Sequence, residues 1–140
     1  MAPAAPRVLI VDDDPDHCDL IARMLHRIGM ETVCASNGWE ALITLDTTTV
    51  DLVLLDLMMP GMDGGTFLNI LRNDQRRKHL PVLVVSAVRS DQAAAKLGRQ
   101  EVQEYFEKAN FELSDLLAAV ESHLHVHGQS EEKKSRHGAN

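Results

Sequence analysis

Polar side chains that could do chemistry together stand directly after short strand-like runs at several places in the chain. They are Asp12 and Asp13 after residues 8–11, Asp56 after residues 52–55, Ser86 after residues 82–85, and Lys108 after residues 102–107. Carboxylates that meet at one place repel each other and raise each other's pKa values, unless a cation or water relieves the repulsion. Mg²⁺ is the expected cation, because it binds through one or two carboxylates together with waters and phosphate oxygens.

A carboxylate in such a cluster can also act as a nucleophile. It attacks a phosphoryl group and forms an acyl phosphate, provided that cations disperse the charge on the transferred group. Asp56, with Mg²⁺ and the ammonium group of Lys108 nearby, has the parts that this reaction needs.

Five alternating strand and helix units are predicted to position these side chains. The strands are expected at residues 7–12, 31–35, 51–55, 81–86 and 102–107, and the helices at residues 15–28, 37–45, 66–72, 90–97 and 113–124. Runs such as residues 8–11 are continuously apolar, as in parallel strands with helices on both faces. The predicted fold class is α/β, a doubly wound five-stranded parallel sheet with helices on both faces. Ligands of such sheets bind beyond the carboxyl ends of the strands, where the polar side chains lie.

Local signals place several of the helix ends. Asp14 and Pro15 form an N-cap and first-position pair, and Gly29 ends that helix. Asn37 and Glu40 stand in a capping-box-like relation at the start of the second helix. Residues 59–65, which carry Gly and Pro, are predicted to be a loop.

The totals indicate one globular domain, expected over residues 7–126 between a disordered N-terminus at 1–6 and a polar, flexible tail at 127–140. The net charge of −7 argues against direct binding to nucleic acid or to anionic membranes. The apolar runs are too short to span a bilayer, and no secretion signal is evident, so a cytoplasmic location is expected. Cys18 and Cys34 are expected to be buried, reduced thiols.

The ordered motifs resemble the response regulator receiver family of two-component systems, which includes the chemotaxis regulator CheY. They are V-D-D at 11–13, L-L-D-L-M-M-P-G-M-D-G at 54–64, V-S-A at 85–87 and Lys108, and the resemblance covers roughly residues 7–125. It implies the flavodoxin-like strand order 2-1-3-4-5.

The resemblance also implies roles for individual residues. Asp56 would be the phosphoacceptor. Mg²⁺ would be bound directly by Asp13, largely through water by Asp12, and by Asp56 and the backbone carbonyl of Met58. Ser86 would bind a phosphate oxygen, Lys108 would face the phosphate, Tyr105 would rotate with the switch, and Ala87 would leave the phosphate accessible.

The implied function is that of a phosphorylation-dependent signalling switch in a phosphorelay. The chain would accept a phosphoryl group from a histidine kinase or phosphotransfer protein and present a changed surface to a downstream protein target. It would catalyse only its own phosphorylation and dephosphorylation. A homodimer linked to phosphorylation is a further assembly that the resemblance allows.

Three departures from the family pattern bear on the mechanism. Ala109 follows Lys108, where the family usually has proline, often in a cis peptide, and residues 100–104 replace a common Gly-Ala pair. Met58 and Val88 occupy positions that influence hydrolysis in the family, and neither side chain can orient a water, which predicts a long-lived phosphoryl state.

Two other functions remain open. One is a receiver-like scaffold that works without phosphorylation. The other is an aspartyl-phosphate phosphatase, because Asp12 and Asp14 at a strand end are similar to the haloacid dehalogenase pattern.

Two metal sites are rejected on spacing. A calcium loop starting at Asp12 would need Glu where Arg23 stands and Gly at the sixth position. Alternate histidines at 123, 125 and 127 point apart on a helix, so they predict no metal site.

Overall fold

A sheet of five parallel strands forms the centre of the computed structural model, which describes residues 5–97 and 102–124. The strands are β1 (Arg7–Val11), β2 (Glu31–Ala35), β3 (Leu52–Leu55), β4 (Val82–Ser86) and β5 (Glu104–Glu107). Their order across the sheet is β2-β1-β3-β4-β5 and every neighbouring pair is parallel. The predicted fold class and strand order are therefore confirmed.

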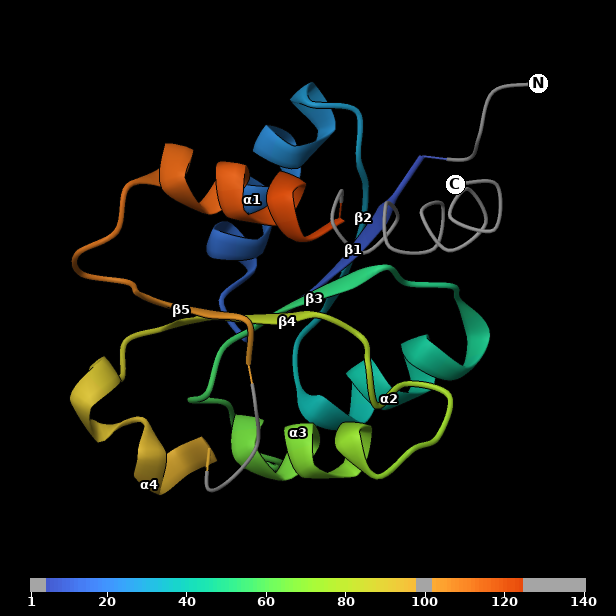
Figure 1. Cartoon of the computed structure of the whole chain (residues 1–140), viewed down its shortest axis with the longest axis vertical. Coiled ribbons are helices and arrows are strands. Elements are labelled where there is room, and N and C mark those ends of the chain that lie inside the picture. The colour runs from blue at the N-terminus through green and yellow to red at the C-terminus, as the bar shows by residue number, and fades with distance from the viewer. Residues whose placement is uncertain (1–4, 98–101, 125–140) are drawn as a thin grey trace, which may run out of the picture.

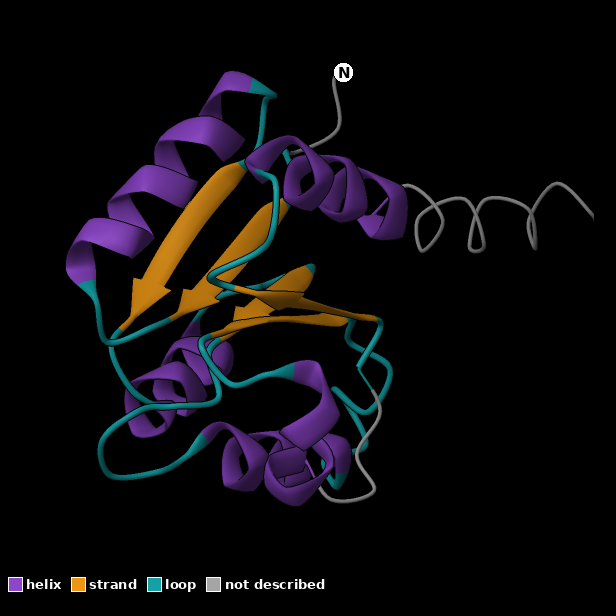
Figure 2. Ribbon diagram, turned by 90° about the vertical axis from the view of Figure 1, so that its left-hand side faces the viewer, coloured by secondary structure: helices purple, strands orange, loops and turns teal. Residues whose placement is uncertain are grey.

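Helices cover both faces of this sheet. They are α1 (Pro15–Arg27), α2 (Gly38–Thr47), α3 (Gly64–Arg72), α4 (Ala94–Leu97) and an unlabelled helical segment over residues 113–124. Figures 1 and 2 show α1 and the 113–124 segment on one side of the sheet, and α2, α3 and α4 on the other.

Two apolar clusters fill the spaces between sheet and helices, because successive side chains of a strand point to opposite faces. Leu9 and Val11 of β1 belong to the cluster under α2 and α3, whereas Val8 and Ile10 belong to the cluster under α1 and the 113–124 segment. The side chains of β3 are buried along its whole length, which explains why its sequence is continuously apolar.

The helix-start signals act as predicted. The Asp14 side chain accepts hydrogen bonds from the backbone N–H groups of Asp16 and His17, with Pro15 at the first helical position. The Asn37 side chain accepts from the N–H of Glu40, while the Glu40 carboxylate reaches back to the N–H of Ser36.

Helix α3 begins at Gly64, two residues earlier than predicted, so the preceding loop is shorter. The side chain of Asp63 accepts from the N–H of Thr66 and caps the helix. A Cβ atom at Gly64 would lie 2.7 Å from the Cα atom of Leu57, so glycine is needed for this close approach. The sequence pattern predicts a loop at Gly64 because the need for glycine there arises only from its contact with Leu57 in the folded chain.

Two elements on the later part of the sheet also differ from prediction. The helix expected at 90–97 is divided into a 3₁₀ turn, η1 (Ser90–Gln92), and the short α4. Strand β5 begins at Glu104 rather than at residue 102, because the side-chain oxygen of Gln103 accepts the N–H of Val82 at 2.6 Å. That donor is then unavailable to a backbone partner.

The predicted tail at 127–140 lies outside the described residues, as do residues 1–4 of the predicted N-terminal segment, His125 and residues 100 and 101. Within the described ranges, no helix has both the length and the apolar character needed to cross a membrane.

Candidate functional site

The predicted site residues lie at the carboxyl edge of the sheet, each at or just beyond a strand end. Backbone hydrogen bonds continue past the strands and hold them there. The N–H of Asp56 donates to the carbonyl of Val11 at 2.9 Å, and the N–H of Lys108 donates to the carbonyl of Ser86 at 2.8 Å. The end of β3 is thus joined to that of β1, and the end of β5 to that of β4, where the polar side chains begin.

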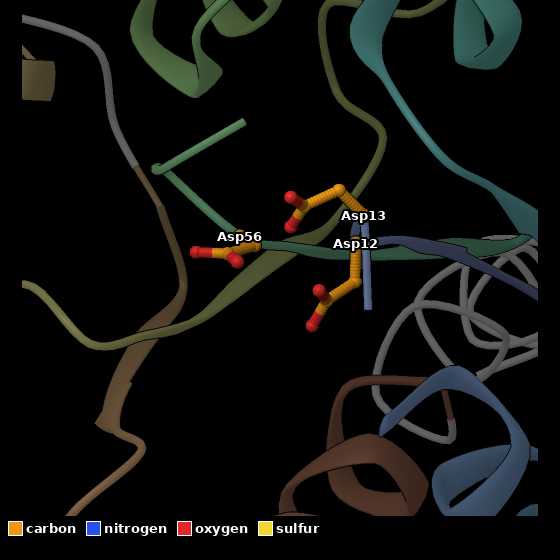
Figure 3. Close-up of side chains that lie close together, drawn as sticks. All are labelled: Asp12, Asp13 and Asp56. Carbon is orange, nitrogen blue, oxygen red and sulfur yellow. The ribbon is translucent and has the colours of Figure 1, made fainter. Parts of the chain in front are cut away.

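Three carboxylates form the acidic part of the site. One oxygen each from Asp12, Asp13 and Asp56 lies within 4.8 Å of the others (Figure 3). Asp12 and Asp56 are buried, whereas Asp13 is exposed. An all-oxygen donor set that is open to solvent on one side fits Mg²⁺, which keeps several of its waters.

The ammonium group of Lys108 lies against two of these carboxylates. Its Nζ atom is 3.0 Å from Oδ2 of Asp12 and 3.1 Å from Oδ2 of Asp56. Burial lowers the pKa of Lys108, but the hydrogen bonds to Asp12 and Asp56 outweigh burial and raise the pKa above its ordinary value. Lys108 therefore stays charged at neutral pH and offsets part of the carboxylate charge.

His17 is a site residue that the sequence analysis missed. Its Nδ1 atom lies 2.6 Å from Oδ2 of Asp12, and its side chain is largely buried. Burial raises the pKa of Asp12, but the hydrogen bonds from His17, from the N–H of Asp14 and from Lys108 lower it further than burial raises it. Asp12 is therefore held as a carboxylate by three donors. A histidine in the first turn of a helix that follows an acidic strand end was the available signal.

Ser86 and Tyr105 meet at the backbone of Val88. Ser86 is fully buried, and its Oγ atom accepts the N–H of Val88 at 3.2 Å. The hydroxyl of Tyr105 donates to the carbonyl oxygen of Val88 at 2.5 Å. Burial raises the pKa of Tyr105, and the carboxylates of Glu107 and Asp56 add to this effect against a hydrogen bond with Ser86. The two residues predicted to switch are therefore linked through one residue.

The loop after β3 holds the remaining oxygen of Asp56. The N–H of Met58 donates to Oδ1 of Asp56 at 3.1 Å, while the Met58 side chain is half exposed. Ala87 is exposed as well. The side chains of Met58 and Ala87 are thus exposed, whereas that of Leu57, next to Asp56, is buried in the core.

Lys108 is followed by a trans peptide, since the described residues contain no cis peptide bond. The N–H of Asn110 donates to the carbonyl of Glu107 and closes a turn there. The Glu107 carboxylate accepts the N–H of Ser90 at 2.8 Å and ties this turn to the start of η1. A chain with Ala109 thus places Lys108 against the aspartates through other contacts.

Four other residues singled out in the sequence add no side chain to the carboxylate cluster. Asp14 caps α1, and His123 faces Glu104 at 2.8 Å. Cys18 is buried as predicted, but the prediction for Cys34 is wrong: its side chain is exposed, because β2 is an edge strand.

The chain is similar to receiver domains over most of its length. The family model described as response regulator receiver domain matches residues 8–121. The DNA-binding dual master transcriptional regulator RpaA of Synechocystis sp. is 34% identical over 119 residues, which are 85% of this chain and 49% of that protein. The sensor histidine kinase GacS of Pseudomonas protegens is 38% identical over 86 residues, 59% of this chain and 9% of that protein.

Solved structures of response regulators are also similar to this chain. The response regulator protein TrrA of Thermotoga maritima, crystallised in complex with Mg²⁺ and BeF, superposes with a TM-score of 0.70 at 30% identity and covers 84% of this chain and 98% of that one. The present chain spans about half the length, or less, of the curated relatives described here.

Proposed function

Because the chain belongs to the response regulator receiver domain family, we propose that it is a phosphorylation switch that accepts a phosphoryl group on Asp56. The observation that carries the proposal is the position of Lys108, which contacts the carboxylates of Asp12 and Asp56 at the edge of the sheet. A cation beside a buried carboxylate is what an acyl phosphate needs, since the product carries more negative charge than the aspartate.

Mg²⁺ is the proposed cofactor. Asp12, Asp13 and Asp56 would hold it with the backbone carbonyl of Met58, and it would supply positive charge to the oxygens of the transferred group. The structure of TrrA with Mg²⁺ and BeF supports this assignment by likeness.

The residues of the chain have separate tasks in the proposed transfer. A carboxylate oxygen of Asp56 attacks phosphorus, a P–O bond forms, and the bond to the leaving group breaks; with a phosphohistidine donor the leaving group is an imidazole nitrogen. The N–H of Met58 and the ammonium of Lys108 each hold one oxygen of Asp56 beforehand, so the carboxylate is oriented before the donor arrives.

The switch itself would pass through Val88. The hydroxyl of Ser86 would donate to a phosphate oxygen, and this shift would disturb the Ser86 Oγ contact with the N–H of Val88. Tyr105 is bonded to the carbonyl of the same residue. Movement at Ser86 therefore favours rotation of Tyr105, which changes the surface formed by β4, β5 and the adjoining loops.

The proposed partners are a histidine kinase or phosphotransfer protein as donor and a protein as downstream target. The relatives include a protein named as a sensor histidine kinase and one named as a DNA-binding regulator, so receiver domains occur in both settings. For this chain, with its net charge of −7, we propose no direct contact with nucleic acid. Its only catalysis would be of its own phosphorylation and dephosphorylation, and we propose that any homodimer is linked to the phosphorylated state.

The phosphoryl group is expected to be long-lived. The side chains of Met58 and Val88 carry no group that could orient an attacking water beside Asp56. Decay of the labelled protein after removal of the donor measures this directly. Rapid loss of the acyl phosphate without a phosphatase would remove the idea.

Intact mass spectrometry after incubation with acetyl phosphate tests the proposal. One phosphoryl adduct is expected on the parent chain with Mg²⁺, and none with a chelator or on Asp56→Asn. Asp51→Asn is a matched control just before the first residue of β3, at the opposite end of the strand from Asp56, and should be labelled like the parent. Absence of any adduct from the folded parent would favour a scaffold that acts without phosphorylation.

A further inference from the structure

The two cysteines of the chain lie together on one face of the sheet. Cys34 of β2 is paired in register with Ile10 of β1, whose side chain belongs to the cluster under α1. Residues paired in a parallel ladder point to the same face. Cys18, in the first half of α1, is buried in that same cluster. Strand and helix thus bring the thiols to one place.

The thiols lie close enough for each to change the pKa of the other, but they differ in access to solvent. Cys34 is exposed at the edge of the sheet, whereas Cys18 is 5% exposed. An oxidant in solution can therefore reach the Cys34 thiol more readily than the buried Cys18 thiol.

We propose that Cys34 and Cys18 are a redox modification site, in which Cys34 is oxidised by a hydroperoxide and Cys18 then closes a reversible disulfide. An exposed thiol next to a second thiol is the arrangement of peroxide-sensitive cysteines with a resolving partner. No other cysteine exists in the chain, so the pair has no competitor within the molecule.

The electrostatics agree with this division of roles. The neighbouring thiol of Cys18 lowers the pKa of Cys34, against smaller opposing effects of burial and of the carboxylates of Asp19 and Asp12. The exposed thiol is therefore the one that more readily becomes a thiolate, which is the nucleophilic form.

The proposed oxidation of the two thiols to a disulfide takes two steps. The sulfur of Cys34 attacks one oxygen of the hydroperoxide, an S–O bond forms, the O–O bond breaks, and water or an alcohol leaves, so the thiol is oxidised to a sulfenic acid. The sulfur of Cys18 then attacks the sulfur of Cys34. An S–S bond forms, the S–O bond breaks, and the hydroxide leaves as water with the proton of the Cys18 thiol. A thiol reductant reverses the change.

The bond would form next to the proposed phosphorylation site. The Sγ atom of Cys18 donates to the carbonyl oxygen of Asp12 at 3.5 Å, and a disulfide would remove that donor and join α1 to β2. The modification itself does not depend on the proposed function, because it needs neither Asp56 nor Mg²⁺.

Treatment of the reduced full chain with hydrogen peroxide, without metal or phosphodonor, tests the proposal. The expected product is a monomer that has lost two hydrogen atoms, with both thiols blocked together and recovered by dithiothreitol. In Cys18→Ala, the sulfenic acid of Cys34 should persist and be trapped by dimedone. In Cys34→Ser, the remaining thiol should react at least about tenfold more slowly than Cys34 does in Cys18→Ala.

Other outcomes overturn the proposal. These are a peroxide product in which Cys34 gains oxygen while Cys18 stays free, a disulfide between two chains in place of the internal one, or equal rates for the two single-cysteine variants. Thermal unfolding of both variants checks that each is folded before the rates are compared. Cys34→Ser changes an exposed position, so the assignment survives even if Cys18→Ala is unstable.

Discussion

Asp56 follows β3 and Lys108 follows β5, 52 residues apart in sequence, and their side chains meet at 3.1 Å beyond the end of β4. The same ammonium lies 3.0 Å from Asp12, so one cation bridges the ends of β1 and β3. Two buried carboxylates thus share a single positive charge. A second cation at this site, or a phosphoryl group on Asp56, would change the electrostatic interactions among Lys108, Asp12 and Asp56.

Replacing Lys108 with Gln is expected to slow labelling of Asp56 by acetyl phosphate. A charge-assisted hydrogen bond contributes about 1.5–3 kcal/mol, and its loss corresponds to roughly a 10–100-fold lower rate. The rate of adduct formation by intact mass measures this. Lys78→Gln, an exposed lysine elsewhere, is the matched control. Equal labelling of Lys108→Gln and the parent would show that the contact has no part in the transfer.

Mg²⁺ is expected to raise the unfolding temperature of the parent chain, because a ligand that binds only the folded state stabilises it. Asp13→Asn should lose about tenfold or more in Mg²⁺ affinity, equivalent to about 1.4 kcal/mol. Without metal the same variant should be as stable as the parent or more so, since one like charge is removed. Asp19→Asn, whose carboxylate is paired with Arg23 on the surface of α1, serves as control. A thermal shift with Mg²⁺ that is the same in Asp13→Asn and the parent would exclude Asp13 as a ligand.

His17→Leu is expected to destabilise the folded chain by about 1–3 kcal/mol, because it removes one donor from the buried carboxylate of Asp12. Urea unfolding in the absence of metal measures the change. His26→Gln lies on the same helix, where its ring contacts Thr32 at an exposed position, and should change stability by less than about 0.5 kcal/mol. Similar effects of the two substitutions would mean that the contact of His17 with Asp12 contributes nothing particular.

The phenol of Tyr105 is expected to titrate above its ordinary pKa of 10.0, because it is partly buried and lies near the carboxylates of Glu107 and Asp56. It is the only tyrosine in the chain, so the ultraviolet absorbance of the phenolate reports it without ambiguity. A raised pKa in the folded state means that its contribution to stability is complete below pH 10 and is lost as the pH rises through the folded-state value. The urea-unfolded chain gives the reference. A folded-state midpoint at or below that reference would contradict the contacts described for Tyr105.

The strands and the site were predictable for a common reason. Buried parallel strands need continuous apolar runs, and ligands bind where those runs end. The positions of Asp12, Asp56 and Ser86 at these ends are therefore enough to predict them as site residues. The helix caps at Asp14 and Asn37 depend only on residues close by in sequence, so they could be predicted as well. The order of the strands was different: it came from the resemblance to receiver domains, since local sequence does not encode which strands are neighbours.

What the sequence could not show depends on contacts made after folding. His17 reaches Asp12 only because α1 starts close to the end of β1, and Gly64 is needed only because α3 passes Leu57 closely. Cys34 has the surroundings of a buried residue in sequence, but its strand is at the edge of the sheet. Such features follow from the packing of elements rather than from the pattern within any one of them.

The position of the phosphoryl group tests the central claim most directly. The chain is labelled with acetyl phosphate and Mg²⁺, reduced with borohydride, which converts an aspartyl phosphate to homoserine, and digested for peptide mass spectrometry. The account predicts homoserine at position 56 and unchanged aspartate at 12 and 13. Homoserine at another aspartate, with residue 56 unmodified, would contradict it.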